Sequence, residues 1–132
     1  MTKIKFFNKV ENLFKLDEKT VEQAILDYLN KIDLTNNYEI EIIFCNADEI
    51  KALNQTYRKI DAPTDVLSFP LEQYDVKKRL LGSLVISPEI VSKKDEPMEE
   101  VIKHGLLHLL GYDHETELSK WSEAAKIIDC KY

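Results

Sequence analysis

The sequence predicts an α+β fold: a single domain with a small mixed sheet of about four strands flanked by helices. Three observations support this prediction. Short stretches with apolar residues at every second position are interspersed with stretches of helical periodicity. One helical stretch is apolar on nearly all sides, which indicates a buried helix. The chain of 132 residues is of a size that buries one core, so we expect residues 1–132 to form one domain.

The first half of the chain predicts two strands and two helices. Residues 3–7 are typical of a short strand, and residues 38–44 alternate apolar and acidic side chains as a strand with one wet face does. Asp17 is a candidate N-cap for an amphipathic helix. Its apolar face would contain Val21, Ala24, Ile25, Tyr28, Leu29 and Ile32. Asn46, with Glu49 three residues later, predicts a second helix through Ile50, Leu53, Asn54 and Tyr57.

The second half predicts two more strands and three helices. Residues 66–69 and 80–87 are expected strands, and the second is nearly continuously apolar and therefore central. Ser87-Pro88 and Asp95-Glu96-Pro97 each pair a capping residue with a proline that favours the first helical turn. The second of these helices is the apolar one, and it contains His104 and His108. A last helix from about Thr116 would bury a stripe of Leu118, Trp121, Ala125 and Ile128.

Charge and composition exclude several classes of protein. The net charge of −6 argues against coating of nucleic acid through bulk charge. Arg58-Lys59, Lys77-Lys78-Arg79 and Lys93-Lys94 could still line a local basic groove, or they could be ordinary solvated surface. No stretch of 18 apolar residues suggests a membrane span. The two cysteines lie far apart in sequence, so we expect a reducing, cytoplasmic environment and no disulfide.

The three histidines indicate a metal site. His104, His108 and His114 are the only histidines in the chain and fall within eleven residues. On a helix, residues four apart lie about 40° apart around the axis, so His104 and His108 project from one face. Gly111 can take a positive φ and end the helix, which would let His114 return toward the pair. Three ligands leave a fourth position open, as in catalytic zinc sites.

Gly105 separates this site from a well-known class of zinc peptidases. The histidines and Gly111 fit the pattern H-E-x-x-H-x-x-G-x-x-H in register, but position 105 is glycine where those peptidases have glutamate. That glutamate is the general base of peptide hydrolysis. A metallopeptidase-like hydrolase is therefore the second choice among enzymes.

A second polar stretch covers residues 54–70 and contains Arg58, Asp61, Thr64 and Asp65 around Pro63. Taken alone, these residues are ordinary turn, cap and helix-end residues. Taken with the histidines, the pattern N-x-x-Y-R-x-x-D-x-P-T-D-V-L-S-F-P, then L-G-x-x-x-I-S and H-G-L-L-H-L-L-G-Y-D-H, resembles the bacterial YbeY family. These motifs span residues 54 to 114.

The resemblance implies a zinc-dependent, single-strand-specific endoribonuclease that acts in 16S ribosomal RNA 3′-end maturation, ribosome biogenesis and ribosome quality control. It implies His104, His108 and His114 as ligands of one Zn²⁺ per chain, and Arg58 as the functional arginine of the cleft. The implied partners are single-stranded ribosomal RNA, the small ribosomal subunit, and a ribosomal protein or ribosome-associated GTPase, without a membrane.

Some assignments stay open on the sequence alone. The family usually has an acidic residue after the glycine of L-G-x, and this chain has Ser83. Thr64, Asp61 and Asp65 are candidates for a general base, and the aspartates could equally hold the loop. Either Asp113 or Glu115 could orient a ligand histidine. A ribosome-assembly factor with a mainly structural zinc is the alternative outside enzymes.

Overall fold

The computed structural model describes residues 3–10, 17–32, 39–70, 80–112, 118–128 and 130. Strands and helices follow one another in an irregular alternation within these residues. They are β1 (Lys3–Asn8), α1 (Glu18–Ile32), β2 (Glu39–Phe44), α2 (Ala47–Arg58), β3 (Val66–Pro70), β4 (Leu80–Ile86), α3 (Pro88–Lys93), α4 (Met98–Leu109) and α5 (Leu118–Ile127). The predicted segments are confirmed, with boundaries that shift by one or two residues.

The four strands form one mixed sheet in the order β1-β2-β4-β3. β1, β2 and β4 run parallel, and β3 pairs antiparallel with β4. This arrangement confirms the α+β prediction and the central position of β4. Alternation in β2 places Ile40, Ile42 and Phe44 in the core, as expected from its sequence. β3 is the outermost strand on its side among the described residues.

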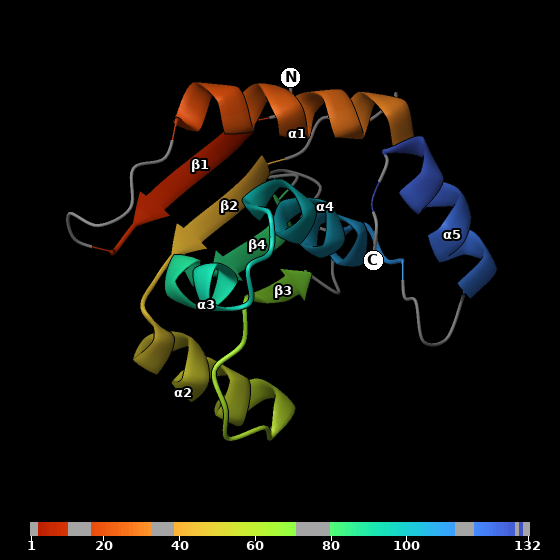
Figure 1. Ribbon diagram of the computed structural model, residues 1–132. Helices are drawn as coiled ribbons and strands as arrows, with labels where there is room; N and C mark the ends of the chain where they lie inside the picture. The colour runs from red at the N-terminus through yellow and green to blue at the C-terminus, as the bar shows by residue number, and fades with distance from the viewer. Residues whose placement is uncertain are drawn as a thin grey trace.

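The helices cover the two faces of the sheet unequally (Figure 1). One face packs under α1, α3, α4 and α5 in a large apolar cluster. The other face packs against α2 through a smaller cluster of Cys45, Ile50, Leu67 and Val85, with Ile43, Leu53 and Phe69 at its border. Successive β3 residues therefore point to different helices: Val66 joins the large cluster and Leu67 the small one.

Side-chain caps start two of the helices as their sequences predict. Asp17 accepts hydrogen bonds from the backbone N–H (3.3 Å) and the hydroxyl (2.7 Å) of Thr20, and Asn46 accepts one from the N–H of Glu49 at 2.9 Å. Pro88 occupies the first turn of α3. In α4, Pro97 is itself the N-cap residue rather than the first helical residue.

α4 is buried along most of its length, and it carries an ionic cluster in the interior. The ammonium of Lys103 lies 3.5 Å from carboxylate oxygens of both Glu99 and Glu100, and 5.3 Å from the ring centre of Tyr28. The hydroxyl of Tyr28 donates to Glu99 at 2.7 Å. Because Lys103 and Glu100 are nearly inaccessible to water, this cluster satisfies charges that would be costly if left unpaired. It also ties α4 to α1.

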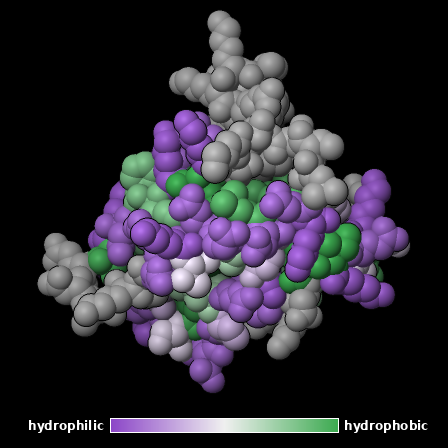
Figure 2. All heavy atoms as spheres, turned by 90° about the horizontal axis from the view of Figure 1, so that it is seen from above, coloured by the Kyte–Doolittle hydropathy of each residue, from purple (hydrophilic) through white to green (hydrophobic). Residues whose placement is uncertain are grey.

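Two apolar or aromatic side chains near helix ends are largely exposed. Leu118 at the start of α5 is 64% exposed, so its expected place on the buried stripe was wrong, and Tyr57 in the last turn of α2 is 64% exposed as well. The side seen in Figure 2, which looks down on α1, is mostly hydrophilic with hydrophobic patches between polar side chains.

None of the described helices combines the length and hydrophobicity needed to cross a bilayer. Cys45 and Cys130 are not joined by a disulfide.

Candidate metal centre

α4 brings His104 and His108 together on one face, as their spacing predicts. Their Nε2 atoms lie 3.2 Å apart, and their ring centres are 4.8 Å apart at an interplanar angle of 70°. Two nitrogens that each lie about 2.0–2.1 Å from a tetrahedral zinc ion are separated by about 3.3 Å. The pair therefore fits two ligands of one metal ion. The same distance also suits a hydrogen bond in which one neutral imidazole donates to the other.

Trp121 is the residue of this site that the sequence did not reveal. Its ring packs against His104 with centroids 5.1 Å apart and against His108 at 5.0 Å. Trp121 comes from α5 and is only 3% exposed. Its position on an apolar helical stripe predicted burial but not its neighbours. The indole limits the rotation of both imidazoles and excludes water from one side of the pair.

Gly105 sits at a close contact between α4 and the sheet. A Cβ atom at this position would lie 2.8 Å from Cδ2 of Leu84 and 3.1 Å from Cγ2 of Val66, closer than side chains normally approach. The carbonyl oxygen of Gly105 also accepts a hydrogen bond from the hydroxyl of Ser68 at 3.0 Å. Glycine at 105 thus allows close helix–sheet packing. It also leaves no room for the glutamate of the peptidase pattern on this side of the helix.

The end of α4 turns as the sequence predicts. Gly111 has φ of +94°, its N–H bonds to the carbonyl of His108, and the N–H of Tyr112 bonds to the carbonyl of Leu107. This is a Schellman ending, which closes a helix around a left-handed residue. His114 lies outside the described residues, as do Asp113 and Glu115. Among the residues that are described, no three potential ligands gather at one point, and the third ligand stays a prediction.

Arg58 lies on a different helix from the histidines. It is the last residue of α2, which packs on the opposite face of the sheet from α4, and its side chain is exposed. Lys59 follows with φ of 61° and ends the helix. With the other described residues, the Arg58 guanidinium forms no ion pair or hydrogen bond, and no such contact joins it to the histidines.

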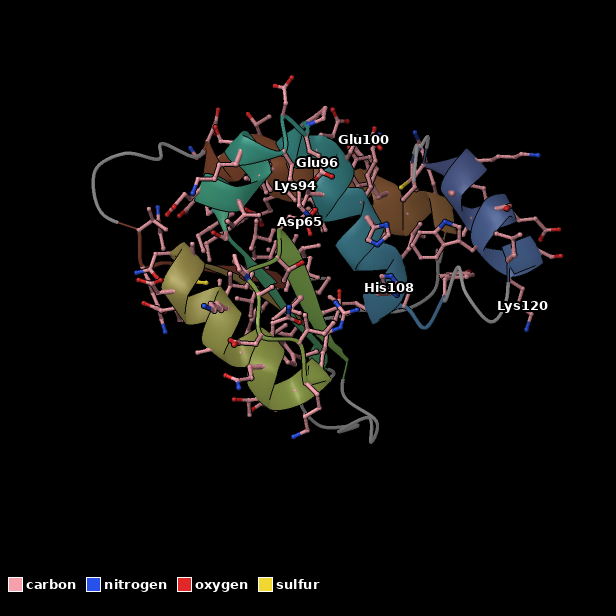
Figure 3. The ribbon with its side chains drawn as sticks, turned by 60° about the horizontal axis from the view of Figure 1, so that its bottom comes forward. Asp65, Lys94, Glu96, Glu100, His108 and Lys120 are labelled. Atoms are coloured by element: carbon pink, nitrogen blue, oxygen red, sulfur yellow. The ribbon has the colours of Figure 1, made fainter. Side chains whose placement is uncertain are left out.

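Asp65 holds the loop that precedes β3. Its carboxylate accepts hydrogen bonds from the N–H of Val66 at 2.8 Å and the hydroxyl of Thr64 at 3.2 Å, and lies 3.8 Å from the ammonium of Lys94. Burial opposes its ionisation, but a hydrogen bond from Glu96 and the charge of Lys94 lower the pKa of Asp65. Figure 3 shows this group at the start of β3, apart from His108. These contacts favour the loop-holding role for Asp65 over that of general base.

The pKa of Glu96 is raised by its neighbour Asp65, and this raised pKa makes stability depend on pH. The hydrogen bond to Asp65, with burial second, raises the pKa of Glu96 to about 7. An acid with a raised pKa in the folded state stabilises the fold below its ordinary pKa, and that stability is lost as the pH rises through the folded value. The lowered pKa of Asp65 acts only at lower pH, outside this window.

We therefore expect the urea midpoint of the native protein to fall between about pH 5 and about pH 8, and that of Glu96→Gln to fall less, since glutamine keeps a donor but cannot ionise. The two proteins are otherwise identical, so the difference between the two curves isolates Glu96. Parallel curves would contradict the raised pKa of Glu96.

Ser83 meets a carboxylate from the neighbouring strand. The hydroxyl of Ser83 donates to Oε2 of Glu41 at 3.1 Å, and the two residues are register partners of β4 and β2. The acidic residue expected at position 83 from the family resemblance is absent. A carboxylate nevertheless lies beside that position, on the sheet face that α2 covers.

Comparison with known proteins agrees with the motifs. The family model described as Endoribonuclease YbeY matches residues 5–126. A protein of Aliarcobacter butzleri named Endoribonuclease YbeY is 44% identical over 113 residues, covering 77% of this chain and 81% of its own length. One of the same name from Sulfurovum sp. is 39% identical over 122 residues, covering 82% of each chain. The solution structure of TM1509 from Thermotoga maritima has a TM-score of 0.55 at 29% identity, covering 96% of this chain and 87% of that one.

Proposed function

Because this chain belongs to the YbeY endoribonuclease family, we propose that it is a zinc-dependent endoribonuclease that cleaves single-stranded RNA. Its biological role would be maturation of the 16S ribosomal RNA 3′ end, ribosome biogenesis and ribosome quality control in the cytoplasm. The small ribosomal subunit, with a ribosomal protein or a ribosome-associated GTPase, would present the RNA. The observation that carries the proposal is the 3.2 Å separation of two imidazole nitrogens on α4 of a chain from this family.

His104, His108 and His114 would hold the zinc ion. When bound, zinc supplies positive charge near a phosphate oxygen and lowers the pKa of water. Trp121 keeps the His104 and His108 rings oriented for that task and shields one side from solvent. The close contact at Gly105 and the hydrogen bond from Ser68 fix how closely α4 approaches the sheet.

Arg58 would bind the phosphodiester. Its guanidinium is always charged, and its planar fork of donors matches two oxygens of one phosphate. An arginine that contacts the scissile group stabilises the charge that develops there during cleavage. Its exposure leaves the guanidinium accessible to a large substrate such as RNA.

We expect the Arg58→Ala variant to cleave single-stranded RNA about 100-fold more slowly than the native protein. Removal of one charge-stabilising donor slows other enzymes by about this factor. Arg58→Lys should recover only part of the rate, because lysine lacks the two-pronged geometry. The measurement is cleavage of a labelled single-stranded RNA by zinc-loaded protein, with and without chelator. The matched control is Lys51→Ala, an exposed cation on the same helix.

Cleavage that persists at full rate in Arg58→Ala or with chelator would mean a contaminating nuclease and refute the proposal. Binding of RNA without any cleavage by the native protein would favour the assembly-factor function, in which RNA is held rather than cut. Both outcomes are separable from misfolding by comparing the urea midpoints of the variants.

A further inference from the structure

Tyr57 is an exposed aromatic side chain held in a defined orientation. It occupies the last turn of α2, yet 64% of it is open to solvent. Its ring meets the ring of Phe69 edge-on, with centroids 5.0 Å apart and an interplanar angle of 71°. Phe69 in turn packs against the small core cluster under α2. The Tyr57 ring is therefore anchored by an edge contact while most of its surface stays accessible.

The positive charges beside Tyr57 suit a negatively charged strand of nucleic acid. Arg58 and Lys59 follow it directly, and both are exposed. The nearby carboxylate of Asp61 lies 3.9 Å from the ammonium of Lys51, which offsets its charge. In a chain with a net charge of −6, an accessible aromatic ring beside two cations is a local departure from the acidic surface. Proteins that bind single-stranded nucleic acid combine such rings with cationic groups, because every base has a face that can stack.

The edge strand β3 links Tyr57 to the histidine helix. Phe69, which holds Tyr57, directly follows Ser68, whose hydroxyl binds the carbonyl of Gly105 between the two histidines. The side chains of Ser68 and Phe69 point to opposite faces of the sheet, and β3 runs between α2 and α4 in both Figure 1 and Figure 3. No further strand covers β3 among the described residues. An extended polymer that crosses this edge can contact both helices.

We propose that Tyr57 forms a base-stacking subsite, in which one unpaired nucleotide of the RNA lies on the tyrosine ring while its backbone follows Arg58 across the edge of β3. This inference rests on the proposed function, because it assigns a position to part of the same substrate. A protein partner is the less favoured occupant, since two cations, Arg58 and Lys59, follow the ring directly and Ile60 is the one large apolar side chain exposed beside them.

The test is equilibrium binding of zinc-loaded protein to a 2′-O-methyl single-stranded oligonucleotide that contains one 2-aminopurine, scanned along the strand. Stacking of 2-aminopurine quenches its fluorescence, and a denaturing gel confirms that the strand stays intact. We expect quenching at one position with the native protein and with Tyr57→Phe, which keeps a ring. Tyr57→Leu keeps apolar contact with Phe69 but has no ring, and should bind about 5- to 100-fold more weakly without quenching.

Phe7→Ala is the matched control, since Phe7 is a 46% exposed aromatic on β1 at the far edge of the sheet, and it should bind as the native protein does. If Tyr57→Leu binds and quenches like the native protein, the stacking subsite is refuted while the nuclease proposal stands. If the native protein fails to bind or cut any single-stranded RNA, the proposed function fails and the subsite with it. Loss of ribosomal-subunit binding in Tyr57→Leu with unchanged RNA binding would assign this surface to a protein and overturn the inference.

Discussion

His108→Ala is expected to lower bound zinc from about one ion per chain to well below that value and to slow RNA cleavage at least 100-fold. The imidazole of His108 lies 3.2 Å from that of His104, so its loss removes one of two ligands that the fold already brings together. With fewer ligands the metal would dissociate during purification, because affinity depends on all of them being in place. Metal analysis of purified protein and a cleavage assay measure the two effects.

Cys130→Ser is the control for this prediction, because it removes a thiol, the other strong zinc ligand type, from the C-terminal part of the chain. Its zinc content should equal that of the native protein. If Cys130→Ser loses metal and His108→Ala does not, the ligand set proposed here is wrong. Full metal content in both variants would mean that the close histidine pair is a hydrogen-bonded pair and no more.

Gly105→Glu is expected to destabilise the protein by at least about 3 kcal/mol and to produce no peptidase activity. The substitution restores the peptidase pattern in sequence, but its Cβ would lie 2.8 Å from Leu84 and its carboxylate would enter apolar packing. A buried charge without a partner is among the most destabilising changes known for single residues. The measurements are the urea midpoint and hydrolysis of a general peptide substrate.

Gly105→Ala separates the steric cost from the cost of the charge. Alanine favours a helix over glycine by about 1 kcal/mol, whereas overpacking costs about 1–3 kcal/mol, so a smaller net loss is expected. The double variant with Leu84→Val should recover part of that loss, because valine lacks the atom that Cβ would meet. A stable Gly105→Glu protein that cleaves peptides would revive the peptidase interpretation.

Local patterns were enough to predict most of the elements. Capping by Asp17 and Asn46, the alternation in β2 and the left-handed turn at Gly111 are each encoded within a few residues, and the structure has all three. The same is true of the His104–His108 pair, because residues four apart meet on any helix. The position of His114 relative to this pair and the role of Arg58 stay predictions.

Contacts between distant segments were not predictable in this way. Leu118 falls on an apolar helical stripe but is exposed, because the stripe indicates which side of the helix faces the core and not how far the neighbouring element extends along it. Trp121 and the hydrogen bond between Ser68 and Gly105 join residues from separate elements. The periodicity of apolar residues in the sequence does not indicate which residues from separate elements will meet.

The sequence by itself determined that this protein has a helix presenting two histidines one turn apart, followed by a glycine turn, within an α+β chain of the YbeY type. Tertiary structure alone decided what surrounds that pair. It placed Trp121 against both rings and Gly105 close to Leu84, so that the glycine allows close packing as well as marking the missing peptidase base. The physical reason is that hydrogen-bonded turns act over a few residues, whereas packing acts between any surfaces that folding brings together.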